Sequence, residues 1–253
     1  MPKSSRLQRY LITTLLLLVL AAAYSPYMTR TIRLDEAYTL RRYAARLDTA
    51  LIEYSAVNNH FLNSTLLWAS TQTVGNSPLA VRLPVWLASV IALALAYRVA
   101  GRVAGRNAGL IAMTLLGLSL GFANYAVETR GYAYSIALTL AIIDVSLFAP
   151  PTRRRRYALI GLSFLLLMTL PSLAYLLGGI VLWLLFRAFI QRDTQALADV
   201  PALVIGGGAA GLFYLPSFTL GIFNEYIELI GIGTGMPADP RGLWNEVRRL
   251  IFA

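Results

Sequence analysis

The sequence predicts an all-α polytopic membrane protein with about seven transmembrane helices and two interfacial amphipathic helices in the first outer loop. Three observations support this prediction. The 253 residues are 57% hydrophobic and 13% charged, whereas soluble domains are about half apolar and about a quarter charged. Apolar runs long enough for the roughly 30 Å hydrocarbon core of a bilayer recur along the chain. Basic residues gather in short clusters between these runs.

Composition also narrows the classes of partner and chemistry. The net charge is +10, but the basic residues are scattered between apolar runs rather than gathered on one aromatic-bearing face, so no nucleic-acid partner is expected. The chain has no cysteine. A disulfide framework, a cysteine-ligated zinc site and a thiol nucleophile are therefore excluded.

The N-terminal segment predicts a membrane anchor. "MPKSSRLQR" supplies a basic start, and residues 10–29 that follow carry no charge. An "AAA" within this run resembles a secretory cleavage site. We favour an uncleaved span, because about 20 residues at 1.5 Å each match the hydrocarbon core. The full set of predicted spans is 10–28, 79–97, 108–127, 131–149, 157–171, 173–187 and 199–218.

The stretch between Arg156 and Arg187 is too long for one untilted span and contains Pro171, so we divide it there. This division places "PPTRRRR" and "FRAFIQR" on the same side of the membrane, as the preference of Lys and Arg for cytoplasmic loops requires. The N-terminus is then cytoplasmic, in a plasma membrane of the bacterial inner-membrane type.

With this topology the outer face receives the loop 29–78 and the tail 219–253. Residues 1–218 form one transmembrane module that includes the outer loop. Nine of the twelve acidic residues lie outside. Among them are Asp35 and Glu36, which follow the first span closely enough to lie at the membrane surface.

Two interfacial helices are expected within the outer loop. Leu40, Ala44, Leu47, Leu51 and Tyr54 recur at steps of three and four with charged residues between them, which predicts one amphipathic helix lying in the interface plane. "FLNSTLLWAST" at 61–71 predicts the second helix, with a tryptophan at headgroup depth.

The adjacent acids Asp35 and Glu36 are the first candidate for chemistry. On a helix their side chains diverge by about 100°, so they are expected to have different roles. The alternative is that Asp35 caps the interfacial helix while Glu36 favours its first turn.

"YAVETRGYAY" is the second candidate, because Glu128, Arg130 and Tyr132 lie between two spans joined by almost no loop. Arg130 suits an anionic headgroup, since its fork of donors matches phosphate oxygens. The alternative is a Glu128–Arg130 pair that fixes topology. His60, the only histidine, is either a solvated loop residue, a hydrogen-bond donor to phosphate or a metal ligand; a lone histidine supports a divalent metal only weakly.

Other patterns are expected to be structural. "GGGAAG" at 206–211 lies within an apolar span and indicates close helix packing. "RRRR" at 153–156 is a cytoplasmic anchor. "NST" at 63–65 matches a glycosylation sequon by letter only. Asp144 is expected at an inner boundary or in helix packing; as the only midplane ionisable candidate, it gives a transporter little support.

Several segments in this order and on these sides resemble a known family: "LDEAYTL", "NNHFLN", "YRVAGRVAGRNAG" and "NYAVETRGYA". They are similar to bacterial relatives of protein O-mannosyltransferases and aminoarabinose transferases, which are GT-C glycosyltransferases of family 39 type. The similarity covers residues 10–218 and concerns the N-terminal seven-helix module.

The resemblance implies a sugar transferred from a polyprenyl-phosphate donor to an acceptor on the outer face, by inverting displacement. Asp35 would be the catalytic base, with Glu36 as an acceptor-positioning or supporting acid and Glu128 orienting the cation or assisting the acceptor. Arg130 and His60 would bind the donor phosphate, and Tyr132 and Tyr38 would line the cavity. Apart from membrane lipid and this donor, no partner is identified, and neither a cofactor nor the acceptor is implied with certainty.

Members of this family run beyond seven spans. The resemblance therefore implies that the chain is a fragment lacking a C-terminal part, works with another subunit, or is an inactive derivative. A non-catalytic membrane subunit built on the same module is the alternative function.

Overall fold

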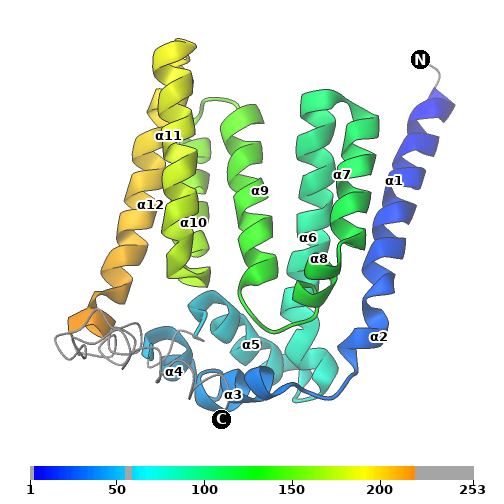
Figure 1. The fold of residues 1–253 in the computed structure, drawn as a ribbon, viewed down its shortest axis with the longest axis vertical. Coiled ribbons are helices and arrows are strands. Elements are labelled where there is room, and N and C mark those ends of the chain that lie inside the picture. Colours follow the sequence, from blue (N-terminus) through cyan, green and yellow to red (C-terminus); the bar gives the residue numbers. More distant parts are fainter. Residues whose placement is uncertain (1–2, 55–58, 220–253) are drawn as a thin grey trace, which may run out of the picture.

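The computed structural model describes residues 3–54 and 59–219, and within these ranges every regular element is a helix (Figure 1). The helices in chain order are α1 (Lys3–Ala23), α2 (Ser25–Met28), α3 (Leu34–Arg42), α4 (Leu47–Ile52), α5 (Phe61–Val74), α6 (Pro78–Ala104), α7 (Arg106–Leu118), α8 (Leu120–Tyr125), α9 (Tyr132–Phe148), α10 (Arg153–Thr169), the 3-10 turn η1 (Pro171–Leu173), α11 (Ala174–Ile190) and α12 (Thr194–Thr219).

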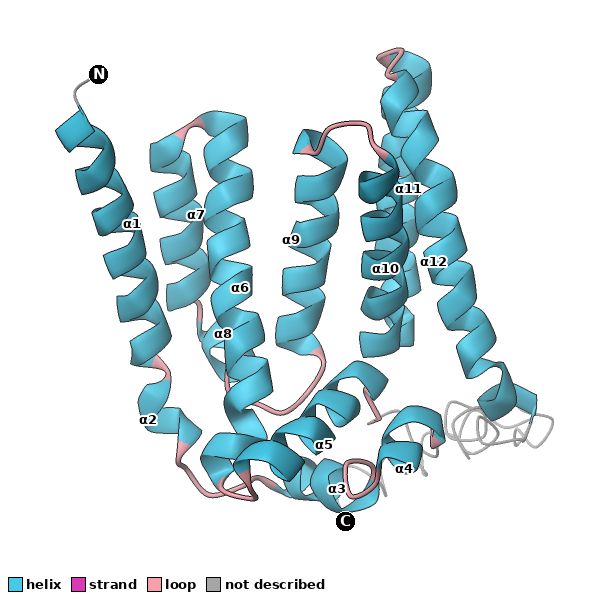
Figure 2. Ribbon diagram, turned by 180° about the vertical axis from the view of Figure 1, so that it is seen from behind, coloured by secondary structure: helices cyan, strands magenta, loops and turns pink. Residues whose placement is uncertain are grey.

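The long helices run side by side, and the short helices α3, α4 and α5 lie across one end of the bundle (Figures 1 and 2). We call this the α3–α5 end. The opposite end holds the start of α1 and the α6–α7, α9–α10 and α11–α12 connections. We call it the basic end, because the arginines at 98, 102, 106, 153–156, 187 and 192 belong to these connections and the helix turns beside them.

Four segments among the described residues are long and apolar enough to cross a membrane. They are Leu11–Met28, Pro78–Ala104, Pro171–Ile190 and Thr194–Leu215. The shorter helices Arg106–Leu118 and Tyr132–Phe148 are also apolar. A bundle that contains several long apolar helices is typical of helical membrane proteins.

One core joins α1, α6, α7, α8 and α9. Leu20, Leu93 and Met113 are buried in it, and Tyr24 donates a hydrogen bond of 2.6 Å to the carbonyl of Gly117. That carbonyl lies near the end of α7, so the bond ties α7 to the end of α1 without leaving a buried hydroxyl unpaired.

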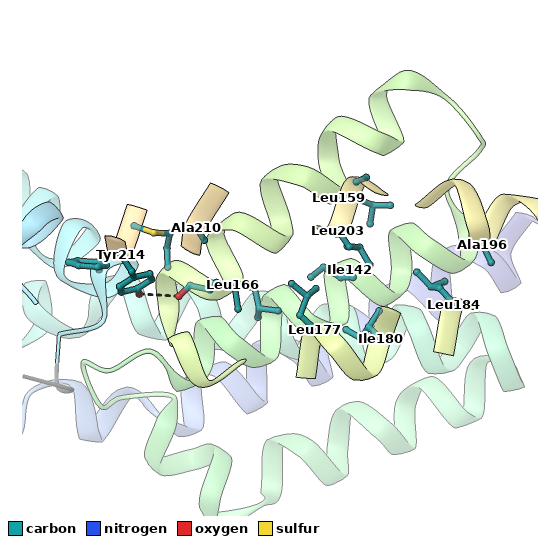
Figure 3. Packing of buried hydrophobic residues seen from close by; sticks show 14 of the residues in the cluster. Ile142, Leu159, Leu166, Leu177, Ile180, Leu184, Ala196, Leu203, Ala210 and Tyr214 are labelled. Carbon is teal, nitrogen blue, oxygen red and sulfur yellow. Dashed lines mark hydrogen bonds between the residues drawn. The ribbon is translucent and has the colours of Figure 1, made fainter. Parts of the chain in front are cut away.

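A second core joins α9, α10, α11 and α12 (Figure 3). Leu166, Leu177 and Leu203 come from three different helices and pack together there. Tyr214 closes the core toward the α3–α5 end and donates a 3.0 Å hydrogen bond to the carbonyl of Leu167. Gly206 of the "GGGAAG" run lies so close to Ser163 of α10 that no Cβ would fit, which is the close packing expected of small residues in membrane helices.

Two helix interruptions fall where backbone chemistry favours them. α10 ends at Thr169, Leu170 is extended, and Pro171 begins the turn before α11, so the stretch 157–187 is divided at the predicted proline. The run 108–127, predicted as one helix, is instead divided into α7 and α8. Ser119 between them is extended, and its hydroxyl accepts a hydrogen bond from the backbone N–H of Phe122, which starts a new helix.

The amphipathic helix predicted from Leu40 to Tyr54 is also divided. α3 ends at Arg42, and α4 starts after the extended residue Arg46. Thr49 donates hydrogen bonds to the carbonyls of Tyr43 and Arg46. A continuous helix would use the carbonyl of Tyr43 for its backbone ladder, so the Thr49 hydroxyl competes with the helical pattern there. The carbonyl of Arg46 still accepts the backbone bond from Ala50 that starts α4.

Asp144 lies in helix packing at the basic end. It is buried on α9 and pairs with Arg98 and Arg102 of α6, at 3.0 and 3.2 Å. The predicted outer segment 219–253 lies, apart from Thr219, outside the described residues.

Candidate functional site

Asp35 and Arg130 meet at the α3–α5 end of the bundle, although 94 residues of chain separate them. Asp35 is in the first turn of α3, and Arg130 is in the loop between α8 and α9. Their side chains form an ion pair of 2.5 Å, and Arg130 Nε lies 3.3 Å from Glu128. We call these three residues the Arg130 cluster.

The Arg130 cluster is asymmetric in its exposure. The side chain of Asp35 is 53% exposed, whereas that of Arg130 is 18% exposed. Burial lowers the pKa of Arg130, but a hydrogen bond with the Tyr132 side chain and the charges of Asp35 and Glu128 outweigh burial and raise it. The guanidinium is therefore a fixed cation, and it holds an accessible carboxylate next to it.

Glu36 points in another direction from its neighbour. It is 1% exposed, and its carboxylate accepts hydrogen bonds of 3.0 and 2.6 Å from Arg82 of α6. Arg82 also donates to four backbone carbonyls, at positions 27 and 28 in α2 and at positions 30 and 31 between α2 and α3. The Glu36–Arg82 pair thus fastens the segment before α3 to α6.

Glu36 also caps its own helix and contacts the loop of the Arg130 cluster. It accepts hydrogen bonds from the backbone N–H groups of Arg33, at 2.9 Å, and Thr129, at 3.4 Å. Burial raises the pKa of Glu36, but the hydrogen bonds from Arg82, Arg33 and Thr129 together outweigh burial and lower it. Glu36 therefore caps the start of α3. The capping role that the sequence suggested for Asp35 is filled by Glu36 instead.

The two adjacent acids therefore divide two tasks. Glu36 joins α3 to the backbone of Thr129. Asp35 directly precedes Glu36 and Arg130 directly follows Thr129, so this contact brings two members of the Arg130 cluster together. Asn63 of α5 donates a 3.0 Å hydrogen bond to the carbonyl of Thr129. Both the N–H and the carbonyl of Thr129 are thus hydrogen-bonded to side chains, which positions the neighbouring residues Glu128 and Arg130.

His60 lies in the buried interior, not in a solvated loop. Its Nδ1 is 3.0 Å from the carbonyl of Thr169, and because a carbonyl only accepts, Nδ1 carries the proton. A Cβ on Gly131 would lie 2.9 Å from this nitrogen. Burial lowers the pKa of His60 to about 4, and the charge of Arg130 adds to this, against the opposite effect of the Thr169 bond. The ring is neutral at pH 7, and its Nε2 is an acceptor.

The two tyrosines proposed to line the cavity differ in position. Tyr132 begins α9, its ring lies 4.5 Å from that of Tyr125 and 5.9 Å from His60, and it is hydrogen-bonded to Arg130. Tyr132 therefore borders the Arg130 cluster. Tyr38 is on α3, exposed, with its ring edge-on to Tyr43.

A pocket of about 480 Å³ opens beside the cluster. Its walls come from the segment between α2 and α3, with Arg30, Arg33 and Arg82 among them, and from Val127. Val127 directly precedes Glu128, so the pocket and the Arg130 cluster share a loop. Arg30 stacks 3.9 Å over the ring of Tyr27, which holds one of these cations in place. Walls of this charge suit an anionic group.

Sequence reasoning missed Arg30, Arg33 and Arg82. A signal was present: the predicted topology puts Arg30 and Arg33 in the outer loop, where Lys and Arg are expected to be rare. Arg82 also falls within the predicted span 79–97, where a charge is costly unless it is paired. Its partner Glu36 lies 46 residues away, which the pattern of a single helix does not reveal.

No group of three or more His, Cys, Asp or Glu side chains that could hold a metal ion occurs in residues 3–54 and 59–219. Comparisons of the chain with family models, with curated proteins and with solved structures found no match.

Proposed function

We propose that this chain is a membrane glycosyltransferase that moves a sugar from a polyprenyl-phosphate donor to an acceptor on the extracytoplasmic face. The observation that carries the proposal is the contact between Asp35 and Arg130. A half-exposed carboxylate and a partly buried guanidinium, joined at one end of an apolar bundle, are the two groups that base-assisted transfer from a lipid phosphate needs.

The reaction assigns a separate task to each group. Asp35 takes the proton of the acceptor hydroxyl, and the acceptor oxygen forms a bond to the anomeric carbon. The bond between that carbon and the phosphate oxygen breaks, and the electron pair leaves with the lipid phosphate. Arg130 stabilises the negative charge that develops there. A displacement in one step inverts the anomeric centre.

Arg130 can serve a phosphate while it keeps its present contacts. A guanidinium has five N–H donors, and Asp35, Glu128 and Tyr132 occupy only part of this fork. Glu128 orients the cation. The arginine-lined pocket beside the cluster adds positive potential for an anionic donor.

Glu36 and His60 take positioning roles in this proposal. Glu36 is fully engaged by Arg82 and by two backbone N–H groups, so it has no exposed oxygen for an acceptor. His60 presents an acceptor nitrogen, which repels a phosphate oxygen, and its bond to Thr169 holds α5 against the end of α10.

The proposed orientation follows from charge. Seven crossings place the basic end in the cytoplasm, where Lys and Arg are favoured. The α3–α5 end then lies at the outer surface of a bacterial-type plasma membrane, with α3, α4 and α5 at the interface. A cysteine in place of Asp48, which is exposed on α4, should react with an impermeant thiol reagent added outside cells. Labelling only after the cytoplasm is opened would reverse this orientation.

Reconstitution tests the function itself. The purified chain in liposomes is supplied with polyprenyl-phosphate mannose or polyprenyl-phosphate aminoarabinose and with a membrane extract as a source of acceptors. The proposal predicts chain-dependent release of polyprenyl phosphate, detected by mass spectrometry. Release that requires a second protein in addition to the chain supports the alternative of a non-catalytic subunit. Absence of release under both conditions refutes the proposal for these donors.

A further inference from the structure

A second pocket, of about 470 Å³, lies between α10 and α12 at the basic end, opposite the Arg130 cluster. From α10 it is lined by Arg153, Arg156, Tyr157 and Ile160, and from α12 by four small or apolar residues that include Pro201 and Ile205. We call it the α10–α12 groove.

The groove follows from the spacing of its residues. Positions 153, 156, 157 and 160 of α10 recur at steps of three, one and three, and positions 198, 201, 202 and 205 of α12 repeat the same steps. Each set is therefore one face of its helix. The contact at Gly206 brings the two helices together at the far end of these faces, and small residues such as Ala198 and Ala202 leave space between them.

The four arginines at 153–156 lie in different surroundings. Arg155 is buried, pairs with Asp199 and donates to the carbonyls of Ser146 and Ala149, so it fastens α10 to α12. Arg153 and Arg156 line the groove and are exposed. Arg154 is exposed and does not line it.

The cations of the groove lack a carboxylate partner among the described residues. Asp199 is taken by Arg155, and Asp193 pairs with Arg187 at 2.5 Å and caps the first turn of α12. Arg153 and Arg156 form no ion pair in the ranges that the structure describes. Two uncompensated guanidinium groups at the mouth of an apolar groove complement a negatively charged headgroup with an attached chain.

We propose that the α10–α12 groove binds one anionic phospholipid of the cytoplasmic leaflet. Its phosphate contacts Arg153 and Arg156, and the first part of an acyl chain lies along Ile160 and Ile205. The exposed ring of Tyr157 lies at the headgroup level, where tyrosine is favoured. This inference is independent of the sugar-transfer activity, because the groove and the Arg130 cluster lie at opposite ends of the bundle.

Native mass spectrometry of the full chain in detergent, titrated with phosphatidylglycerol or phosphatidylcholine, tests the proposal. One phosphatidylglycerol per chain should be retained in preference to phosphatidylcholine. Arg153→Gln combined with Arg156→Gln should weaken retention about twenty-five-fold, at about five-fold for each charge removed near a membrane surface. Arg154→Gln, one residue away, removes the same charge outside the groove and should change retention by less than about two-fold.

A substitution in the α12 wall of the groove tests the proposal without changing any charge. Ala198→Phe fills the groove from α12 and should weaken phosphatidylglycerol binding while both arginines remain. Glycerol phosphate, which carries the anionic group without acyl chains, should not displace the lipid. Equal retention of the two lipids, equal loss in the Arg154→Gln variant, unchanged binding in Ala198→Phe or displacement by glycerol phosphate would each overturn the proposal.

Discussion

Removing the charge of Glu36 tests whether this residue holds the site together or acts on the substrate. Glu36→Gln keeps the size of the side chain but leaves Arg82, which is 3% exposed, without its carboxylate. Loss of one partner from a buried ion pair costs about 3–5 kcal/mol. Because Arg82 keeps its hydrogen bonds to four backbone carbonyls, we expect the lower end of this range, about 3 kcal/mol.

For a chain of this size, about 3 kcal/mol corresponds to a fall in Tm of about 6–12 °C. The assay is thermal unfolding of the purified protein in detergent, followed by tryptophan fluorescence. Asp48→Asn is the control, because Asp48 also pairs with an arginine at 2.5 Å but on the exposed surface; its Tm should not change measurably. The double variant Glu36→Gln/Arg82→Gln should lose less than the sum of the two single variants.

If Glu36→Gln unfolds at the wild-type temperature and yet loses sugar transfer, Glu36 acts on the substrate and the positioning role assigned to it here is wrong.

Three further predictions follow from the same region. Arg130→Lys keeps the charge but loses the fork of donors, so sugar transfer should fall about 10²-fold, and a variant with wild-type turnover would show that a simple positive charge is enough. The pKa of His60 is lowered from 6.5 to about 4 in the folded state, so folding stability should be complete above pH 6.5 and decline by up to about 3 kcal/mol as pH falls toward 4; in His60→Gln this decline in Tm should be smaller, and an equal decline would assign it to other groups. Gly131→Ala places a Cβ 2.8–3.0 Å from the atoms of three groups and should destabilise the fold by about 1–3 kcal/mol, whereas Gly178→Ala, which has open space at its Cβ, should not lower Tm.

The helical architecture could be anticipated from the sequence because apolar runs and proline act locally. The interruption at Pro171 is an example, since proline itself disfavours a helix in the residue before it. The interruptions at Ser119 and around Arg46 escaped prediction. They depend on single hydroxyl groups that bond to nearby backbone, and a hydrophobic pattern averaged over a helix does not detect such groups.

The site was predictable to a smaller extent. The predicted membrane topology places Asp35 and Arg130 at the same end of the bundle, and in the structure their side chains are in contact. The separate tasks of Asp35 and Glu36 follow from their divergence on a helix, but the inward partner of Glu36 depends on tertiary packing with α6. The burial of His60 depends likewise on Thr169, 109 residues away, and no local signal in "NNHFLN" reports it.

The most direct test of the central claim compares two aspartates that differ only in their surroundings. Asp35 and Asp48 have side chains 53% and 52% exposed, and each lies 2.5 Å from an arginine. Release of polyprenyl phosphate by the reconstituted Asp35→Asn variant should fall at least about 10²-fold, while Asp48→Asn keeps wild-type turnover. Wild-type turnover in Asp35→Asn would contradict the assignment of Asp35 as the base.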